Sequence, residues 1–427
     1  MAIVIPTDKL DNTKSIRAIG EAIIGYEPVR NSFINALINR FAFTIISSKG
    51  FIDPWAFMER GTIEYGETIE EIFANLAKVQ SYDPEQSAAR EFKRSIPDVK
   101  SAFHTMNYQK QYPVTISQSQ LRQAFLSYGA MSDLVERVIN TLYTALEYDK
   151  FITKKYMIAN AVINGELPVV STSELTTEEQ AKENIVTLRS TVEKMGFLNT
   201  AYNTAQVYNS DTIDDLFIIC PADKRAYVDV MVNAVAYNLG YTDFMGHVVS
   251  VDDLSEHDTK RLKELFGADG FTEFTDDQIA TLQKVNFVLL SRDKMQIYIN
   301  ERDMTEEFIA SGKYWNYWLN NWMTFSMSPY AQCAVFASGQ NEIESVTVSP
   351  ETATLSAGAG MLFTAKVAGT GIVDTSVVWS VTGNNSSNTK FENNQLIIAK
   401  DETATELTVT ATAADGQTGV AMVEIQQ

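Results

Sequence analysis

The chain is poor in the residues that usually carry catalytic and metal chemistry. It has 2 cysteines and 3 histidines among 427 residues. Cys220 and Cys333 lie in apolar or small-residue segments, so we expect buried free thiols in a protein that folds in a reducing compartment. Paired His or Cys metal spacings, a Walker loop, a nucleophile elbow and a dinucleotide fingerprint are all missing. The sequence therefore predicts no enzyme, no cofactor site and no metal site.

Long apolar runs and positive charge are also scarce. No stretch of about 18 apolar residues occurs, and no basic-then-apolar leader opens the sequence, so we expect neither a membrane span nor a secretory signal. The chain carries 34 Lys and Arg against 54 Asp and Glu, a net charge of −20. A protein this acidic does not grip nucleic acid through a general basic face, because phosphate binding needs clustered Lys and Arg. The charge does not exclude a protein that encloses nucleic acid without binding it tightly.

Length and composition indicate two folding units with a boundary near residue 340. A single core stops growing at roughly 250–300 residues, which this chain exceeds. Residues 341–427 are rich in Thr, Val, Ala, Gly and Ser, and they predict a small all-β sandwich. Its expected strands are 344–350, 361–367, 377–381, 395–398, 407–412 and 420–425. We expect Trp379, in the middle of the third strand, to fill the sandwich core; a surface Trp that stacks on a sugar is the alternative.

Residues 1–340 mix helix and strand patterns, which predicts an α+β fold. The clearest helix is 119–164, where apolar residues recur in steps of three, four and seven. Ser119 is placed to cap its start and Gly165 to end it, and Gly129 is a candidate kink. At 1.5 Å per residue such a helix is a rod of roughly 65 Å. A rod this long indicates a structural spine rather than part of a compact enzyme domain.

A lobe of alternating helices and strands follows the predicted spine. A capping-box sequence at Thr176–Glu179 begins a helix that Gly196 should end, and a second capping box lies at Thr275–Gln278. Residues 223–239 predict another helix. Short apolar runs predict strands at 216–220, 247–251, 286–290 and 295–299. This alternation is typical of a mixed α/β lobe.

Two clusters are candidates for contact with a partner. Residues 58–112 are polar and predict a long hairpin that leaves the body of the protein. Four glutamates in it form either an exposed acidic face or a docking surface for a basic neighbour: Glu64, Glu67, Glu70 and Glu71. The densest aromatic stretch, 313–322, is expected to be buried in the fold or at a subunit contact, in preference to binding a ligand. Its interface candidates are Tyr314, Trp315 and Trp318.

The remaining polar residues of interest are three acidic pairs and one histidine. The pairs are Asp214–Asp215, Asp252–Asp253 and Asp276–Asp277. Paired carboxylates can bind a cation or divide acid and base roles, but adjacent residues rarely point into one site. Solvated turns or helix starts are therefore the preferred interpretation. His104 has no catalytic or metal-binding partner at a recognisable spacing, and we expect it to make an ordinary polar contact.

The order of polar hairpin, spine helix, α/β lobe and β tail resembles a tailed-phage major capsid protein of the Hong Kong 97 type. The resemblance is closer to the capsid protein of phi-29-like podophages, and the tail is similar to their bacterial immunoglobulin-like (Ig-like, group 2) domain. The motifs that carry the resemblance are Gly66–Ile72, Gln80–Asp83, Phe92–His104, Ala124–Gly129, Thr242–Gly246 and Tyr314–Tyr317. Their shared order covers the chain from about Ile46 to its end.

The resemblance implies a head-shell subunit with a capsid body at 1–340 and an Ig-like domain at 341–427. Residues 58–112 would be the extended loop that overlaps a neighbour, 119–164 the spine helix, and about 200–314 the axial domain. Hexamers and pentamers would assemble on a scaffolding protein and around a portal, in the host bacterial cytoplasm. The mature virion shell, icosahedral or prolate, would enclose packaged double-stranded DNA.

The resemblance also bears on single residues and on alternatives. Charge reversal at Glu70 and Glu71 should weaken contacts between capsomers, while no Lys–Asn pair can be assigned to a covalent cross-link. The Ig-like tail is expected on the outer surface, where head fibres or host-surface glycans are candidate partners. A bacterial surface or adhesion protein with an Ig-like tail is the main alternative, and an enzyme with a carbohydrate-binding domain is a third.

Overall fold

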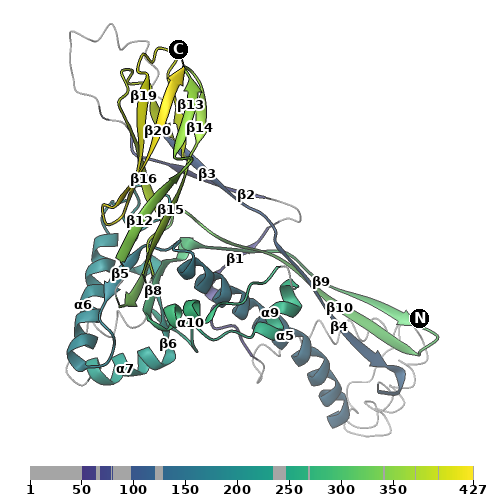
Figure 1. The fold of residues 1–427 in the computed structure, drawn as a ribbon. Coiled ribbons are helices and arrows are strands. Elements are labelled where there is room, and N and C mark those ends of the chain that lie inside the picture. Colours follow the sequence, from purple (N-terminus) through teal and green to yellow (C-terminus); the bar gives the residue numbers. More distant parts are fainter. Residues whose placement is uncertain are drawn as a thin grey trace.

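The computed structural model describes residues 51–63, 68–77, 79, 98–120, 128–233, 247–267, 270–339, 342–370, 372–392 and 394–426. They form a mixed α+β subunit whose parts spread out in space (Figure 1). A body of one sheet and its helices lies at the centre. Long strands run out from the body to one side, and a group of short strands, drawn in light green and yellow, stands at one end.

The body is built on a five-stranded sheet with the order β5-β11-β8-β6-β7. Its strands are β5 (Val169–Thr172), β6 (Leu216–Pro221), β7 (Val248–Val251), β8 (Val285–Ser291) and β11 (Cys333–Ser338). β8 is antiparallel to both β6 and β11, while β5 and β7 join the two edges in parallel. Every residue of β6, β8 and β11 is buried, because helices cover both faces. The strands predicted at 216–220, 247–251 and 286–290 are confirmed.

Two separate cores lie on the two faces of this sheet. One core packs under α6 (Glu178–Met195) and α7 (Ala222–Asn233). The other packs under α5 (Tyr128–Ile163), α9 (Thr259–Phe266) and α10 (Asp276–Gln283). Successive strand residues alternate between the cores, so that Phe217 and Ile219 face α5 while Ile218 and Cys220 face α6. Cys220 and Cys333 are free and buried, as predicted.

The predicted spine helix is confirmed as α5 over its 36 residues from Tyr128. This length corresponds to about 54 Å. The residues directly before Tyr128 lie outside the described ranges, so the kink predicted at Gly129 stays a prediction. Leu142, Ile152 and Ala159 lie on its buried side. Gly165 follows the last turn with φ +67°, the left-handed conformation that ends helices. No helix in the described ranges is both long and apolar enough to span a membrane.

The helices α6 and α10 begin at capping boxes, one of them a residue later than predicted. α6 is capped by Thr177 rather than Thr176, because the side chain of Gln180 reaches back to the Thr177 N–H at 3.1 Å. Gly196 ends α6 and Thr275 caps α10, both as predicted. Asp276 and Asp277 lie in the first turn of α10, where carboxylates favour the positive end of the helix dipole.

The other two acidic pairs also lie where elements begin or the chain turns. Asp214 and Asp215 belong to the short 3-10 helix η5 (Ile213–Asp215) that precedes β6. Directly after β7, Asp252 accepts a hydrogen bond from Lys155, and Asp253 accepts from the Ser255 N–H and hydroxyl. The interpretation of these pairs as turns and helix starts is confirmed.

A second sheet carries the long strands that leave the body, with the order β1-β9-β10-β4. Its strands are β1 (Glu59–Thr62), β4 (Tyr108–Ser117), β9 (Met295–Ile309) and β10 (Tyr314–Met327). β9 extends well beyond the predicted 295–299, because it pairs with β10 along the whole hairpin. The middle of α5 packs on this sheet, with Leu142 and Leu146 against Tyr112 and Leu319.

Residues 342–426 form an all-β unit with its own core. The strands are β12 (Glu342–Ser349), β13 (Thr352–Ser356), β14 (Gly360–Leu362), β15 (Thr364–Thr370), β16 (Val377–Thr382), β17 (Lys390–Glu392), β18 (Gln395–Ile397), β19 (Glu406–Ala413) and β20 (Thr418–Gln426). All six predicted strands are present, although 361–367 is divided between β14 and β15. β13 and β17 were missed because they are short and carry little apolar pattern. We call this unit the sandwich.

The sandwich is fastened to the body at the C-terminal end of α5. Ile372, between β15 and β16, is 3 % exposed and belongs to the core of the body rather than that of the sandwich. Thr375 Oγ1 donates to the Gly165 carbonyl at 3.0 Å. A Cβ on Gly165 would lie 2.5 Å from the Val373 carbonyl oxygen and 2.6 Å from Thr375 Cγ2. Glycine is therefore required at position 165 for two reasons: its left-handed backbone conformation, and the space that the 373–375 loop occupies where a Cβ would lie.

The variant Gly165→Ala should loosen this attachment. Left-handed backbone costs an L-residue about 1–2 kcal/mol, and the clash with the 373–375 loop adds to that cost. Gly416→Ala is the matched control, because Gly416 has φ +92° but open space around it. We expect urea unfolding to show a larger loss for Gly165→Ala, together with faster proteolysis between body and sandwich. Equal losses for the two variants would contradict the role assigned to the loop.

Candidate subunit interface

The predicted hairpin is present as a two-stranded ribbon between the body and the sandwich (Figure 1). β2 (Ile69–Ala74) pairs antiparallel with β3 (Val99–His104), and we call these two strands the ribbon. It lies within the predicted range 58–112 and pairs with no other described strand. Because side chains alternate along each strand, the ribbon has two faces with different surroundings.

The inner face of the ribbon is held to the body by polar contacts. His104 is 2 % exposed, and its Nε2 lies 3.1 Å from Glu71 Oε2 while its Nδ1 lies 2.7 Å from Ser326 Oγ. The other Glu71 oxygen accepts a hydrogen bond from Ser328 Oγ at 2.7 Å. Phe73 stacks on Tyr330 with ring centroids 5.4 Å apart. His104 is thus a structural polar contact, as expected, and fixes the ribbon to the end of β10.

These contacts set the charge state of Glu71. Burial alone would raise the pKa of its carboxyl, but the hydrogen bonds from His104 and Ser328 and the charges of His104 and Arg60 act in the opposite direction. The net result is a pKa below the ordinary value of 4.5. The ionised carboxylate is therefore the form that holds the ribbon in place.

The outer face of the ribbon is open and largely apolar. Ile72 is 63 % exposed, Phe103 is 62 % exposed and Val99 is 48 % exposed. Glu70 lies on the same face, directly opposite Phe103 in the strand register. A β-sheet face with this much exposed apolar area is typical of a surface that contacts another molecule.

The acidic cluster of the sequence does not form one surface. Glu70 and Glu71 are neighbours in a strand and so point to opposite faces: Glu70 is exposed, whereas Glu71 is half-buried against the body. The carboxylate of Glu71 is engaged by the body, and its role in a contact with another subunit stays a prediction. Glu64 and Glu67 lie outside the described residues.

The aromatic cluster of 313–322 is likewise divided by strand alternation. Trp315 is 1 % exposed and packs on Phe308, with ring centroids 4.8 Å apart. Tyr317 is fully buried. Tyr314 and Trp318, on the other face of β10, are half-buried. Trp315 is therefore buried inside the subunit, one of the two placements expected for this stretch, while Tyr314 and Trp318 keep part of their surface exposed.

A buried charge cluster anchors the chain just before the ribbon. The ammonium of Lys154, on α5, is fully buried and donates to Asp53 Oδ2 at 2.6 Å, Glu59 Oε1 at 2.9 Å and the Trp55 carbonyl at 3.1 Å. Lys150 donates to the same Glu59 oxygen at 2.9 Å. Burial alone would raise the pKa of Glu59, but the ammonium groups of Lys154 and Lys150 have the larger combined effect and lower this pKa below its ordinary value. We call Asp53, Glu59, Lys150 and Lys154 the anchor cluster.

Sequence reasoning missed the anchor cluster. The only available signal was Lys154–Lys155, two charges within the apolar stretch 151–162 of the predicted spine. A charge in such a stretch is rarely buried without a partner, so it could have prompted a search for an acid elsewhere. That partner, Asp53, lies 101 residues away in the sequence, and no local pattern connects the two.

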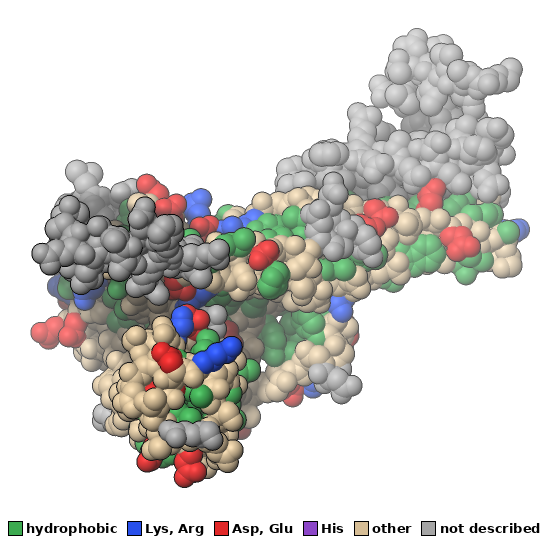
Figure 2. All heavy atoms as spheres, turned by 90° about the horizontal axis from the view of Figure 1, so that it is seen from above, with side chains coloured by type: hydrophobic (Ala, Val, Ile, Leu, Met, Phe, Trp, Pro, Cys, Tyr) green, Lys and Arg blue, Asp and Glu red, His purple; other side chains and the backbone are tan. Residues whose placement is uncertain are grey.

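The described residues offer no obvious site for chemistry. Among them, no group of three His, Cys, Asp or Glu side chains is placed to hold a metal ion. On the face drawn in Figure 2, Lys and Arg side chains are scattered singly or in small groups among polar and apolar ones.

Comparison with known proteins gives consistent matches. The model of the Phi29-like phage major capsid protein family matches residues 8–337. The major capsid protein of Bacillus phage PZA is 31% identical over 412 residues, which cover 96% of this chain and 85% of that protein. The major capsid protein of Bacillus phage B103 is 30% identical over 408 residues, covering 94% of this chain and 85% of that protein.

Solved structures show the same fold at low sequence identity. The capsid structure of Staphylococcus phage Andhra aligns with a TM-score of 0.54 and 13% identity, over 69% of this chain and 86% of that chain. A chain from the structure of the head fibre and inner core protein of bacteriophage P68 aligns with a TM-score of 0.52 and 13% identity, over 68% and 86%. The mixed α+β phage-capsid fold expected from the resemblance is confirmed.

Removing the ammonium of the anchor cluster should be costly. The variant Lys154→Met leaves Asp53 and Glu59 buried without this partner, which typically costs about 3–5 kcal/mol of unfolding free energy. Lys182→Met is the matched control, because Lys182 pairs with Glu178 on the exposed face of α6, and such pairs contribute about 0.5 kcal/mol. Urea denaturation measures both. A loss for Lys154→Met no larger than that of the control would refute the anchoring role.

The ribbon should detach in acid. Because the folded pKa of Glu71 lies below 4.5, its contribution is complete above that pH and is lost as pH falls through the folded pKa. Glu71→Gln should therefore expose ribbon amides to hydrogen exchange at neutral pH, and the difference from wild type should shrink in acid. Glu70→Gln, on the outer face, is the control and should exchange like wild type. Identical exchange in both variants at neutral pH would disprove the contact.

Proposed function

Because this chain belongs to the Phi29-like phage major capsid protein family, it is a structural subunit that assembles with copies of itself into the head shell of the virion, and we propose that the outer face of the ribbon forms a contact between neighbouring subunits. The family is structural rather than enzymatic. The comparisons therefore give no support to the adhesion protein or to the enzyme with a carbohydrate-binding domain.

One observation carries the ribbon proposal. Its inner face is fixed to the body by His104 and Glu71, while Ile72 and Phe103 on the outer face are left more than half exposed. Fully burying side chains of this size is worth about 1.5–3 kcal/mol each. A shell subunit gains that energy only by covering the face with another copy. Glu70, beside Phe103, then meets a basic group of the neighbour.

The division of the chain follows the same proposal. Residues 1–340 are the capsid body, with 58–112 as the extended loop that reaches a neighbour, 119–164 as the spine and about 200–314 as the axial domain. The long hairpin of β9 and β10 is consistent with this proposal, because an elongated subunit has much of its surface available for contact with neighbours. Glu64, Glu67, Tyr314 and Trp318 remain proposed interface residues.

Residues 341–427 are proposed to be an Ig-like domain. The separate core of the sandwich supports this division. Trp379 packs against that core beside Phe363 and stacks on Phe391, with ring planes 7° apart. The proposed place of the domain is the outer surface of the shell, within reach of head fibres or host-surface glycans.

The shell is proposed to consist of hexamers and pentamers, assembled in the bacterial cytoplasm with a scaffolding protein and a portal. Double-stranded DNA is its proposed content. The net charge of −20 supports enclosure over gripping, because DNA held by many Lys and Arg contacts would resist entry and release.

Placing a carboxylate on the outer face tests the ribbon contact. We expect Ile72→Glu and Phe103→Glu each to remove about 1.5–3 kcal/mol of burial at every contact and to add the cost of burying a charge. Assembly with scaffolding protein, followed by sedimentation and negative-stain microscopy, should then yield folded subunits without shells. Val186→Glu is the control, because Val186 is 67 % exposed on α6. Normal shells from both ribbon variants would exclude the contact.

A further inference from the structure

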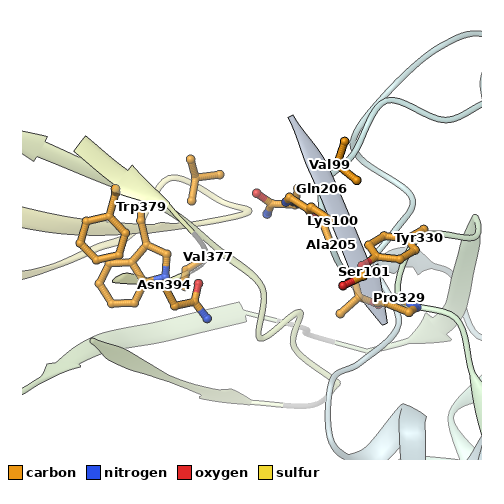
Figure 3. Close-up of a pocket in the computed structure, with 13 residues that line it drawn as sticks. Val99, Lys100, Ser101, Ala205, Gln206, Pro329, Tyr330, Val377, Trp379 and Asn394 are labelled. Atoms are coloured by element: carbon orange, nitrogen blue, oxygen red, sulfur yellow. Dashed lines mark hydrogen bonds between the residues drawn. The ribbon is translucent and has the colours of Figure 1, made fainter. Parts of the chain in front are cut away.

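A cleft opens between the sandwich and the ribbon, and the packing of the fold does not account for it (Figure 3). Its volume is about 700 Å³, which is in the range of small-molecule sites. Trp379, Phe391, Val377 and Asn394 form the wall on the sandwich side. The facing wall comes from β3, from residues 204–206 and from Pro329–Tyr330.

The sandwich wall presents an aromatic pair. The rings of Trp379 and Phe391 are stacked with centroids 4.9 Å apart, and both side chains are half-buried. Each therefore packs on the sandwich core and still lines the cleft. An aromatic platform of this kind binds the C–H face of a flat, amphipathic ligand better than it binds a fully polar one.

The polar groups among the other lining residues are mostly uncharged. Asn394 carries an amide at the cleft edge and Ser101 a hydroxyl on β3, and both side chains are exposed. Gln206 lies between the walls, with its Nε2 3.4 Å from Ser376 Oγ. Amides and hydroxyls both donate and accept, which suits a ligand that carries several hydroxyl groups.

Charge narrows the choice of ligand. The chain has 54 Asp and Glu, yet no carboxylate lines the described cleft, so the site does not suit a cation. Its one cation, Lys100, already donates to the Ala205 carbonyl at 3.1 Å, which leaves little to attract a multiply charged anion. A neutral ligand with apolar C–H faces and many hydroxyl groups satisfies both walls.

We infer that this cleft binds a short, uncharged oligosaccharide, with a sugar ring on the Trp379–Phe391 platform and its hydroxyl groups bonded to Asn394, Gln206 and Ser101. This deepens the proposed outward role of the sandwich by naming the ligand class and the residues. It also joins the two sequence interpretations of Trp379, since the side chain both packs on the core and lines the cleft. Val99 and Ser101 of the outer face of the ribbon also line the cleft, so binding is measured before shells assemble.

The test uses the unassembled full-length subunit and three neutral probes: maltotriose, cellotriose and triacetylchitotriose. Saturation-transfer NMR and tryptophan fluorescence should report binding of at least one of them. Asn394→Gly removes the amide without straining the left-handed backbone, where φ is +60°. Ser101→Ala removes the hydroxyl, and Trp379→Phe keeps a ring on Phe391 but shrinks the platform.

Each of these variants should weaken binding about tenfold, the effect of losing one good hydrogen bond or part of a stacking surface. Gln417→Ala, an exposed amide on the turn between β19 and β20, is the control and should bind like wild type. Failure of all three probes would overturn the inference, and so would binding that all three variants leave unchanged. Shell assembly of Asn394→Gly and Trp379→Phe, which lie on the sandwich and away from the ribbon, distinguishes failure of this site from failure of the ribbon contact.

Discussion

The buried ammonium of Lys154 is the interaction on which the arrangement of this subunit depends. It lies on α5, and its carboxylate partners are Asp53, shortly before β1, and Glu59, the first residue of β1. A lone charge at this depth would be prohibitively costly, so the segment 53–59 has one stable position on the helix. The ribbon continues from that fixed point, and the sandwich is seated at the other end of the same helix, where Gly165 leaves room for its loop. The helix α5 thus fixes the positions of the body, the ribbon and the sandwich relative to one another.

This construction suits a shell. An enzyme concentrates reactive groups in a cleft, whereas the buried polar contacts of this subunit hold its helices and strands in position. His104 and Glu71 illustrate the difference: a histidine and a carboxylate at hydrogen-bonding distance serve to dock a strand. With the inner face docked, the apolar residues of the outer face remain exposed on a rigid support. In the proposed contact, a neighbouring copy buries these residues on a ribbon that is already ordered. The entropic cost of association is therefore lower.

Much of the fold was predictable because its signals are local. The apolar repeat of the spine, the capping residues of α10 and the end of α5 at Gly165 all lie within a few residues of the structure they determine. The buried strands β6 and β8 were recognisable as short apolar runs for the same reason. The shift of the α6 cap by one residue shows the limit of this reading, since Thr176 and Thr177 are chemically alike and only the reach of Gln180 selects between them.

The candidate interface was less predictable, because it depends on which face of a strand meets which neighbour. Composition placed Glu70 with Glu71 and Trp315 with Trp318, but strand alternation and docking on the body separated them. The sequence by itself determined the local elements, the acidic balance and the family resemblance. Only the tertiary structure decided which charges are buried and which apolar residues stay exposed. The physical reason is distance along the chain: Glu71 meets Ser328 across 257 residues, and burial of this kind is encoded by no local pattern.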